Sequence, residues 1–551
     1  MDVHEKTTYK GPSAVFDKET ASDDVGAGQV LSYSGEPPST HRGQLHRNFK
    51  ARHIQMITLG GCIGSGLFIS TGKALHNGGA AAMLIGYTLI CIMALATMNL
   101  LSEATCIWPT SGGFIEHANR FVDPAMAFAC GFTEWLAWVT VVAAEGAIVR
   151  VILTYWTEAI PTAAAMTVYL VIVLGIHALP NKWFAEFEFG TAALKVMCMI
   201  IILITCIALL AGAGKASPDP QGYNYTTGPT FPNGMKGVCT TFLLASWATG
   251  GQEIMSLSAA EAARPRWDMP RACKNLFMRI VLFYELSIIF LTLLVPYNSD
   301  KLLGTSTVAS SPFVIAMVNA GIKGLPDLMN AIILLGLCAI GAESMYVSSR
   351  AMVAMAQMGM FPRFLANIDK QGRPRWALLI TAAFSVMFTY INCSSTGGVI
   401  FTWFSSVSAT VYFMSWMSIS ITNIRMHQAI NAQGDPVWVQ PYAWKLKGWP
   451  ITAIFLFVTS FLVLFGTAYV SLFPIGGAAP NASTFFETFL GVPLWIACYL
   501  GYKLVYRTKF VKPAEADLQY GRRPLNEEDI AFFDHYFAQP MWKRVLSYVR
   551  F

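Results

Sequence analysis

The chain has 551 residues and a formal net charge of +6; 54% of its residues are hydrophobic and 13% are charged. A typical soluble domain carries about 25% charged residues, so this composition predicts an integral membrane protein and excludes a soluble enzyme, a disordered protein and a secreted disulfide scaffold. The positive charge does not indicate a nucleic-acid partner, because the Lys and Arg residues are scattered in loops between apolar runs. The 11 Cys residues show no metal-binding spacing, so neither a metal nor a cofactor is expected.

Residues 1–52 are polar and predict a disordered cytosolic tail. Apolar runs follow that are close to the roughly 20 residues that a transmembrane helix needs. Twelve are expected, at 55–76, 80–105, 126–156, 161–180, 188–211, 238–260, 275–296, 325–355, 376–393, 396–424, 450–473 and 484–506. The sequence therefore predicts an all-α protein with a twelve-helix domain over 53–506. A second cytosolic tail, 507–551, is expected to contain a short helix near Asn526–Tyr536.

The distribution of positive charge sets the orientation. With the N-terminus inside, 21 Lys and Arg residues fall near the inner ends of the spans and 5 near the outer ends. Cytosolic loops carry the excess of positive charge, so both termini are expected in the cytosol. The three N-x-Ser/Thr sequons, at Asn224, Asn392 and Asn481, then lie in outside loops and are candidate glycosylation sites.

Two spans contain glycine clusters in their middle. The first holds Gly60–Gly66 and the sixth holds Gly250 and Gly251. Glycine is poor in helix interiors and permits unwinding, although small residues also serve close helix packing. Because the clusters occupy the first helix of spans 1–5 and of spans 6–10, they predict an inverted-repeat transporter with spans 1 and 6 broken at the midplane around its transport site.

The sequence resembles fungal amino-acid permeases, in the yeast amino-acid transporter group of the amino acid–polyamine–organocation superfamily. The resemblance covers nearly the whole chain and rests on an ordered set of motifs: Ile57–Gly61, Ile63–Phe68, Trp108–Phe114, Arg120–Ala125, Ala144-Glu145, Gly251–Glu253, Glu261-Ala262, Pro270–Ala272, Ser348–Arg350, Gly359–Pro362 and Gly521–Arg523. It implies a fold of two inverted five-helix repeats plus two extra helices, and proton-driven import of amino acids. Departures from the family pattern at Gln252, Thr249, Glu343, Glu134 and Arg150 leave the substrate open.

A zwitterionic amino acid needs partners for its carboxylate and its ammonium. Backbone N–H groups at the start of a half-helix bind anions, so Gly64, Ser65 and Gly66 are the candidate carboxylate site. Carbonyls that end the first half-helices would accept from the ammonium. Trp247 is placed by resemblance to stack on the substrate. The substrate-binding candidates are Ile63, Gly64, Ser65, Gly66, Trp247, Ala248, Thr249, Gly250, Gly251 and Ser344.

Charged residues within spans are costly and therefore functional candidates. Lys195 matches a lysine of proton-coupled superfamily members, whose ammonium replaces a sodium ion; the alternative is a structural ion pair. Glu253, Glu145 and Glu343 are further proton-coupling candidates. Glu134 lies eleven residues before Glu145, which places the two on nearly the same helix face. Glu343 is expected to pair either with Lys195, which is favoured, or with a cationic substrate.

The leading interpretation is a proton-coupled amino-acid symporter that favours neutral substrates, with cationic ones as the alternative. A nutrient sensor on the same fold, an exchanger, and a permease for an amine such as GABA, choline or a polyamine remain alternatives; an enzyme is not expected. The implied partners are an amino acid, a co-transported proton and the lipid bilayer. The resemblance implies a multi-pass protein of the plasma membrane. Lys6, Lys10 and Lys18 could accept ubiquitin from a ligase.

Overall fold

A computed structural model describes residues 63–214, 221–262, 264–303, 311–393, 397–477 and 479–544, and the regular elements in these ranges are helical. The helices are α2 (Thr71–Ile107), α3 (Gly113–Phe121), α4 (Pro124–Leu153), α5 (Thr162–Ala178), α6 (Asn181–Leu210), α7 (Tyr223–Thr226), α8 (Gly234–Thr249), α9 (Glu253–Ser258), α10 (Pro265–Arg279), α11 (Leu286–Leu294), α12 (Pro312–Asn319), α13 (Leu325–Gln357), α14 (Arg375–Ile391), α15 (Gly397–Ala432), α16 (Ile451–Leu472), α17 (Ala482–Phe489), α18 (Gly491–Tyr506) and α19 (Glu527–Ala538). A π-helical turn over Gly66–Ser70 leads into α2, and another over Ile280–Glu285 joins α10 to α11. The predicted N-terminal tail with the candidate ubiquitin acceptors Lys6, Lys10 and Lys18, and the first residues of span 1, lie outside the described residues.

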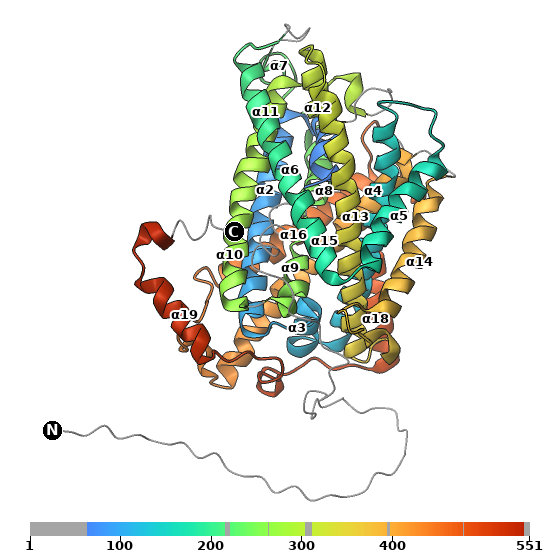
Figure 1. The fold of residues 1–551 in the computed structure, drawn as a ribbon. Coiled ribbons are helices and arrows are strands. Elements are labelled where there is room, and N and C mark those ends of the chain that lie inside the picture. The colour runs from blue at the N-terminus through green and yellow to red at the C-terminus, as the bar shows by residue number, and fades with distance from the viewer. Residues whose placement is uncertain are drawn as a thin grey trace, which may run out of the picture. The chain divides into compact units, whose positions relative to one another are not determined.

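Six helical runs in the described part of the chain are long and apolar enough to cross a membrane, and the pair α17 and α18, bent by 74°, adds a seventh. Two shorter apolar helices, α5 and α14, lie beside α13 (Figure 1). Large apolar side chains such as Val171, Ile204 and Phe465 are exposed on α5, α6 and α16. Large exposed apolar side chains on long apolar helices are typical of faces that contact lipid, and with six or seven such spans they confirm that the chain is a multi-pass membrane protein.

The longest run, Gly66–Ile107, is interrupted at Gly79. The backbone there has φ 75° and ψ 177°, and a Cβ would lie 2.4 Å from Cδ of Pro232. Only glycine fits a positive φ with so close a neighbour. The run contains 42 residues, or about 63 Å of helix at 1.5 Å per residue, about twice the hydrocarbon thickness. The interruption falls between the predicted runs 55–76 and 80–105.

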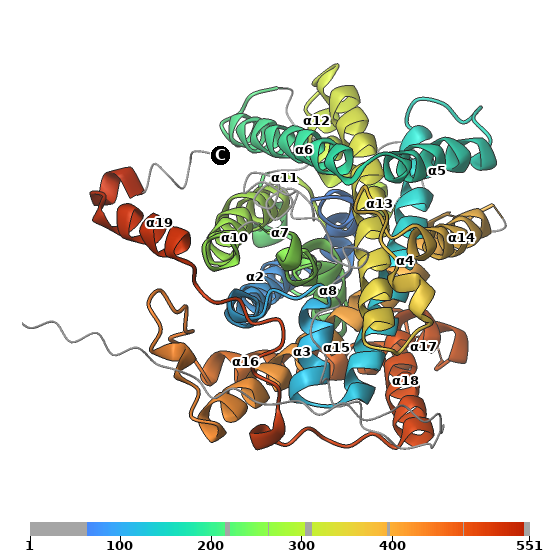
Figure 2. The same cartoon turned by 60° about the horizontal axis from the view of Figure 1, so that its bottom comes forward.

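Helix α4 forms the centre of the bundle. It packs against α13, α14, α15 and α18 (Figure 2), and 78% of its apolar window is buried, compared with 33% for α16. A helix that is apolar on all sides requires such surroundings. Its N-terminus is capped by Asp123, whose Oδ1 accepts from the Ala125 amide at 2.8 Å. Two candidate carboxylates, Glu134 and Glu145, are thereby held in the interior.

Several helix bounds differ from the predicted runs. Helix α10 begins at Pro265 rather than near 275, and α15 continues to Ala432 rather than ending near 424. Hydropathy marks the hydrocarbon layer, whereas hydrogen bonds continue a helix into the polar region beyond it. The predicted run 484–506 is divided by the bend between α17 and α18, which the sequence interpretation missed.

The C-terminal segment packs against one end of the bundle. The Val511 amide donates to Val122 O at 2.8 Å, the Trp108 indole donates to Leu518 O at 3.1 Å, and the Arg523 amide donates to Ile107 O at 3.0 Å. The predicted short helix is confirmed as α19, with Asn526 as its cap. Because these bonds join residues about 400 positions apart, the segment ties the ends of early helices together.

Candidate substrate and proton site

The predicted break in the sixth span is confirmed. Helix α8 ends at Thr249, Gly250 is extended, Gly251 has φ 94°, and α9 starts at Glu253. Two carbonyls at this break are already engaged: Ala248 O accepts from the Tyr284 hydroxyl at 2.8 Å, and Thr249 O accepts from Gln252 Nε2 at 2.5 Å. A substrate ammonium would therefore have to share these carbonyl oxygens with Tyr284 and Gln252 or displace the two donors.

The second half of span 1 meets the break of span 6 through Gly66. A Cβ on Gly66 would lie 2.4 Å from Cα of Ala248 and 2.9 Å from the carbonyl oxygen of Trp247. These are backbone atoms, which cannot rotate away. The two half-helices are thus in direct backbone contact at the positions that the glycine clusters predicted. The residues before Ile63 lie outside the described part of the chain, so the predicted break in span 1 stays a prediction.

Ser65, Glu145 and Trp247 form a hydrogen-bonded network beside this contact. The Ser65 hydroxyl donates to Oε1 of Glu145 at 2.6 Å and accepts from Nε1 of Trp247 at 3.2 Å. Ser65 and Glu145 are buried, and Oε2 of Glu145 has no hydrogen-bond partner among the described residues. The predicted carboxylate site therefore contains a protein carboxylate in this structure.

Helix α13 reaches the same region through Ile340. A Cβ on Gly64 would lie 1.8 Å from Cδ1 of Ile340, so this glycine admits the isoleucine. Ser344 follows one turn later, and its hydroxyl donates to Ile340 O at 2.6 Å. In this structure Ser344 thus bonds within its own helix rather than reaching into the break.

A second buried group joins Glu253 and Glu134. Oε1 of Glu253 accepts from Nε1 of Trp416 on α15 at 2.5 Å, and Oε1 of Glu134 accepts from Nε1 of Trp138 at 2.8 Å. The two carboxylates interact electrostatically. The sequence placed Glu134 and Glu145 on nearly the same helix face, and the structure brings Glu134 to the group at the span-6 break and Glu145 to span 1.

A third buried group contains Lys195. Its ammonium lies 3.8 Å from Oε1 of Glu188, and the two side chains form an ion pair along α6. Glu343 on α13 interacts electrostatically with Glu188, Lys195 and Arg279. The pairing of Glu343 with Lys195 stays a prediction, and Lys195 also forms an ion pair with Glu188. With all four side chains ionised, the two acids and two bases of this group would have no net formal charge.

The three sequons differ in exposure. Asn224 is buried, and its Nδ2, the atom that would carry a glycan, donates to the carbonyls of Thr292 and Val295 at 2.7 Å each. Asn392 is also buried, with Nδ2 donating to Thr389 O at 2.8 Å. Asn481 is exposed. Glycosylation stays a prediction, and the exposure favours Asn481.

Comparison with known proteins decides the family. The model of the amino acid permease family matches residues 53–514. The chain belongs to the amino acid permease family. This permease is 35% identical to the general amino-acid permease GAP2 of Candida albicans over 92% of this chain and 87% of that protein. It is 34% identical to the histidine permease of Saccharomyces cerevisiae, over 89% and 83%, and to the general amino-acid permease GAP1 of the same yeast, over 92% and 86%. These relatives are transporters rather than enzymes, and the resemblance inferred from the motifs is confirmed.

Proposed function

We propose that this permease is a proton-coupled symporter that imports amino acids by alternating access. The observation that carries the proposal is the hydrogen bond from Ser65 to Glu145 at the contact between spans 1 and 6. The hydroxyl has one proton to donate, and Glu145 already receives it. A substrate carboxylate arriving at the same half-helix start would compete with Glu145 for that donor.

Protonation of Glu145 resolves the competition. Two carboxylates that share a site repel one another, and binding of a proton to one of them removes the repulsion. A protonated Glu145 would release the Ser65 hydroxyl and could itself donate a hydrogen bond. Proton and substrate carboxylate are thereby expected to bind together, which is the requirement for symport.

The other two buried groups support transmission of this event. The bond between Glu253 and Trp416 connects α9, directly after the break, to α15. The group around Lys195 connects α6, α10 and α13. We assign Lys195, Glu253, Glu145 and Glu343 to proton coupling. Because the Lys195 group is balanced without a ligand, neutral amino acids are favoured as substrates, with cationic ones as the alternative.

The proposed architecture is twelve spans in two inverted repeats plus two helices, in the plasma membrane with both termini cytosolic. Ubiquitin ligation on the N-terminal tail belongs to the same proposal. Single cysteines in place of Thr20 or Ile530, treated with a membrane-impermeant reagent in intact cells, test the orientation. Neither should be labelled from outside. Labelling of either one contradicts the proposed topology.

Uptake by purified protein in liposomes tests the function. Radiolabelled neutral and cationic amino acids and amines are supplied with and without an inward proton gradient. A symporter accumulates its substrate only with the gradient. Uptake that is independent of the proton gradient but requires an amino acid inside the liposomes would indicate an exchanger. Binding of an amino acid without any uptake would indicate a sensor.

A further inference from the structure

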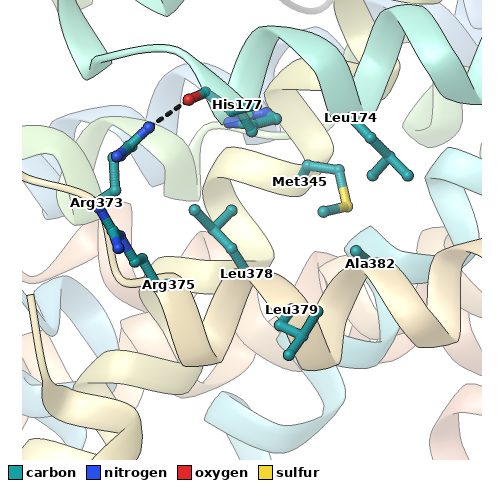
Figure 3. A pocket seen from close by; sticks show the side chains of 9 residues that line it. Leu174, His177, Met345, Arg373, Arg375, Leu378, Leu379 and Ala382 are labelled. Carbon is teal, nitrogen blue, oxygen red and sulfur yellow. Dashed lines mark hydrogen bonds between the residues drawn. The ribbon is translucent and has the colours of Figure 1, made fainter. Parts of the chain in front are cut away.

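A groove on the lipid-facing side of the bundle lies between the ends of α5 and α14, with α13 at its back. It encloses about 310 Å³ and is lined by Leu174, His177, Ala178, Met345, Arg373, Arg375, Leu378, Leu379 and Ala382. Figure 3 shows the two arginines at one end, with Leu174, Met345 and Ala382 toward the other. An apolar trough that ends in two guanidinium groups has the polarity of a phospholipid.

The groove opens to the bilayer. Leu379 on its floor is 60% exposed, and Val171 on the neighbouring α5 is 65% exposed. In a membrane protein such side chains contact acyl chains. Trp376, next to Arg375 at the start of α14, and Trp183, at the start of α6, are 51% and 60% exposed. Exposed tryptophans gather where hydrocarbon meets headgroups, so the arginines lie at headgroup depth.

Asp369 fixes the two arginines in place. Its Oδ2 accepts from Nε of Arg373 at 3.0 Å and from Nε of Arg375 at 2.8 Å. Burial raises the pKa of Asp369, but the hydrogen bonds from the Arg373 backbone and from both guanidinium groups outweigh it, and the net pKa is below its usual range. The ionised carboxylate leaves a surplus of one positive charge across the three residues.

The two guanidinium groups are used differently. Arg373 also donates to Ala178 O, which connects the loop to the end of α5 (Figure 3). The Arg375 side chain is 69% exposed, and its terminal nitrogens have no partner among the described residues. A planar guanidinium with free N–H groups matches the paired oxygens of a phosphate.

We propose that this groove binds an anionic phospholipid, with the phosphate on Arg375 and one acyl chain along Leu174, Leu378 and Ala382. The surplus positive charge favours an anionic headgroup over a zwitterionic one. Under the proposed topology the arginine end faces the cytosol, so the lipid comes from the inner leaflet, where anionic lipids are enriched.

The bound chain would touch the helix that carries two of the candidate site residues. Met345 closes the back of the groove, and the His177 ring donates through Nε2 to Ala342 O at 2.8 Å. Ala342 and Met345 flank Glu343 and Ser344 on α13. Occupancy of the groove is therefore expected to influence the transport site as well as to bind lipid.

Native mass spectrometry of the purified full-length permease tests the proposal. Phosphatidylserine and phosphatidylcholine with the same acyl chains are titrated separately, and inorganic phosphate serves as a third arm. The wild-type protein should retain phosphatidylserine about tenfold better than phosphatidylcholine. Arg375→Gln should lose this preference while Arg375→Lys keeps part of it. Arg363→Gln, in the same loop but outside the groove, is the matched control and should behave as wild type.

Ala382→Phe fills the apolar end without touching the arginines, so it tests the groove even if Arg375→Gln disturbs the loop. It should reduce retention of both lipids. Three results would each overturn the proposal. They are an unchanged preference for phosphatidylserine in Arg375→Gln, unchanged lipid retention in Ala382→Phe, and retention of inorganic phosphate equal to that of phosphatidylserine. Because the readout is lipid binding, failure here is distinguishable from failure of the proposed transport function, which uptake measures.

Discussion

The Ser65 hydroxyl donates a 2.6 Å hydrogen bond to Glu145, eighty residues further along the chain. Ser65 begins the helical part of span 1, and Glu145 lies in the central helix α4. A buried carboxylate requires hydrogen bonds or a proton, and Oε1 obtains one from the residue expected to contact the substrate. The substrate site and the proton site are therefore adjacent in this permease.

Glu145→Gln should separate substrate binding from the proton gradient. The amide resembles a protonated carboxyl, so binding should persist and become independent of pH between pH 5 and 8, whereas accumulation should be lost. Substrate affinity measured across that range checks this. Ser65→Ala is the companion variant and should weaken binding by about two- to tenfold, the effect of one neutral hydrogen bond. A pH-dependent affinity in Glu145→Gln would assign the proton to another group.

Gly66→Val should abolish transport while the protein still reaches the membrane. Its Cβ would lie 2.4 Å from Cα of Ala248, and backbone atoms cannot yield as a side-chain tip can. Gly175→Val is the matched control, because a Cβ there meets no atom within 4 Å. Uptake and surface amount are measured together. Normal uptake by Gly66→Val would show that this contact is not needed for transport.

The break and its glycines could be predicted from sequence because glycine's effect on a helix is local. The partners of the buried carboxylates could not. Glu134 and Glu145 share a face of α4, but eleven residues at 1.5 Å each separate them by about 16 Å along the axis. One consequently meets Trp138 and Ser415, and the other meets Ser65. Helix periodicity predicts the direction of a side chain, whereas its neighbour depends on how distant helices pack.

Lys195→Ala should abolish accumulation while exchange of internal for external substrate continues. The substitution also leaves Glu188 without its ion pair, and breaking a buried pair costs about 3–5 kcal/mol. The double variant Lys195→Ala with Glu188→Gln removes that stability defect. It should restore the amount of folded protein, measured by size-exclusion profile, but not accumulation. Lys182→Ala, at the exposed start of the same helix, is the control. Restored accumulation in the double variant would make Lys195 purely structural.

Glu343→Gln should change the pH response of uptake for all substrates alike. Glu343 interacts with Glu188, Lys195 and Arg279, so its removal leaves one surplus positive charge near Lys195 whichever substrate is bound. Competition assays with alanine, proline, lysine and arginine across a pH series check this. A selective loss of lysine and arginine uptake would instead identify the substrate as the partner of Glu343.

Glu134→Gln should move half-maximal uptake to a lower pH. It removes the carboxylate that interacts with Glu253, and a like charge opposes ionisation of its neighbour. Trp138→Phe removes the indole that donates to the ionised Glu134 carboxylate, which weakens the negative charge next to Glu253, and should move the profile in the same direction by a smaller amount. A shift to higher pH in either variant, or no shift in Glu134→Gln, would remove Glu253 from the set of proton-coupling residues.

The C-terminal segment has a consequence for biosynthesis. Residues 511–523 bond to Val122 and Ile107, which leave the ribosome nearly four hundred residues earlier. Arg522 also pairs with Asp435 after α15, at 2.5 Å. The helices can enter the membrane one after another during translation, but these ends stay unlinked until residues 511–523 have been made. A chain released after α18 but before this segment would contain α2 to α18 and lack the link, so the link distinguishes such a chain from one that includes the segment.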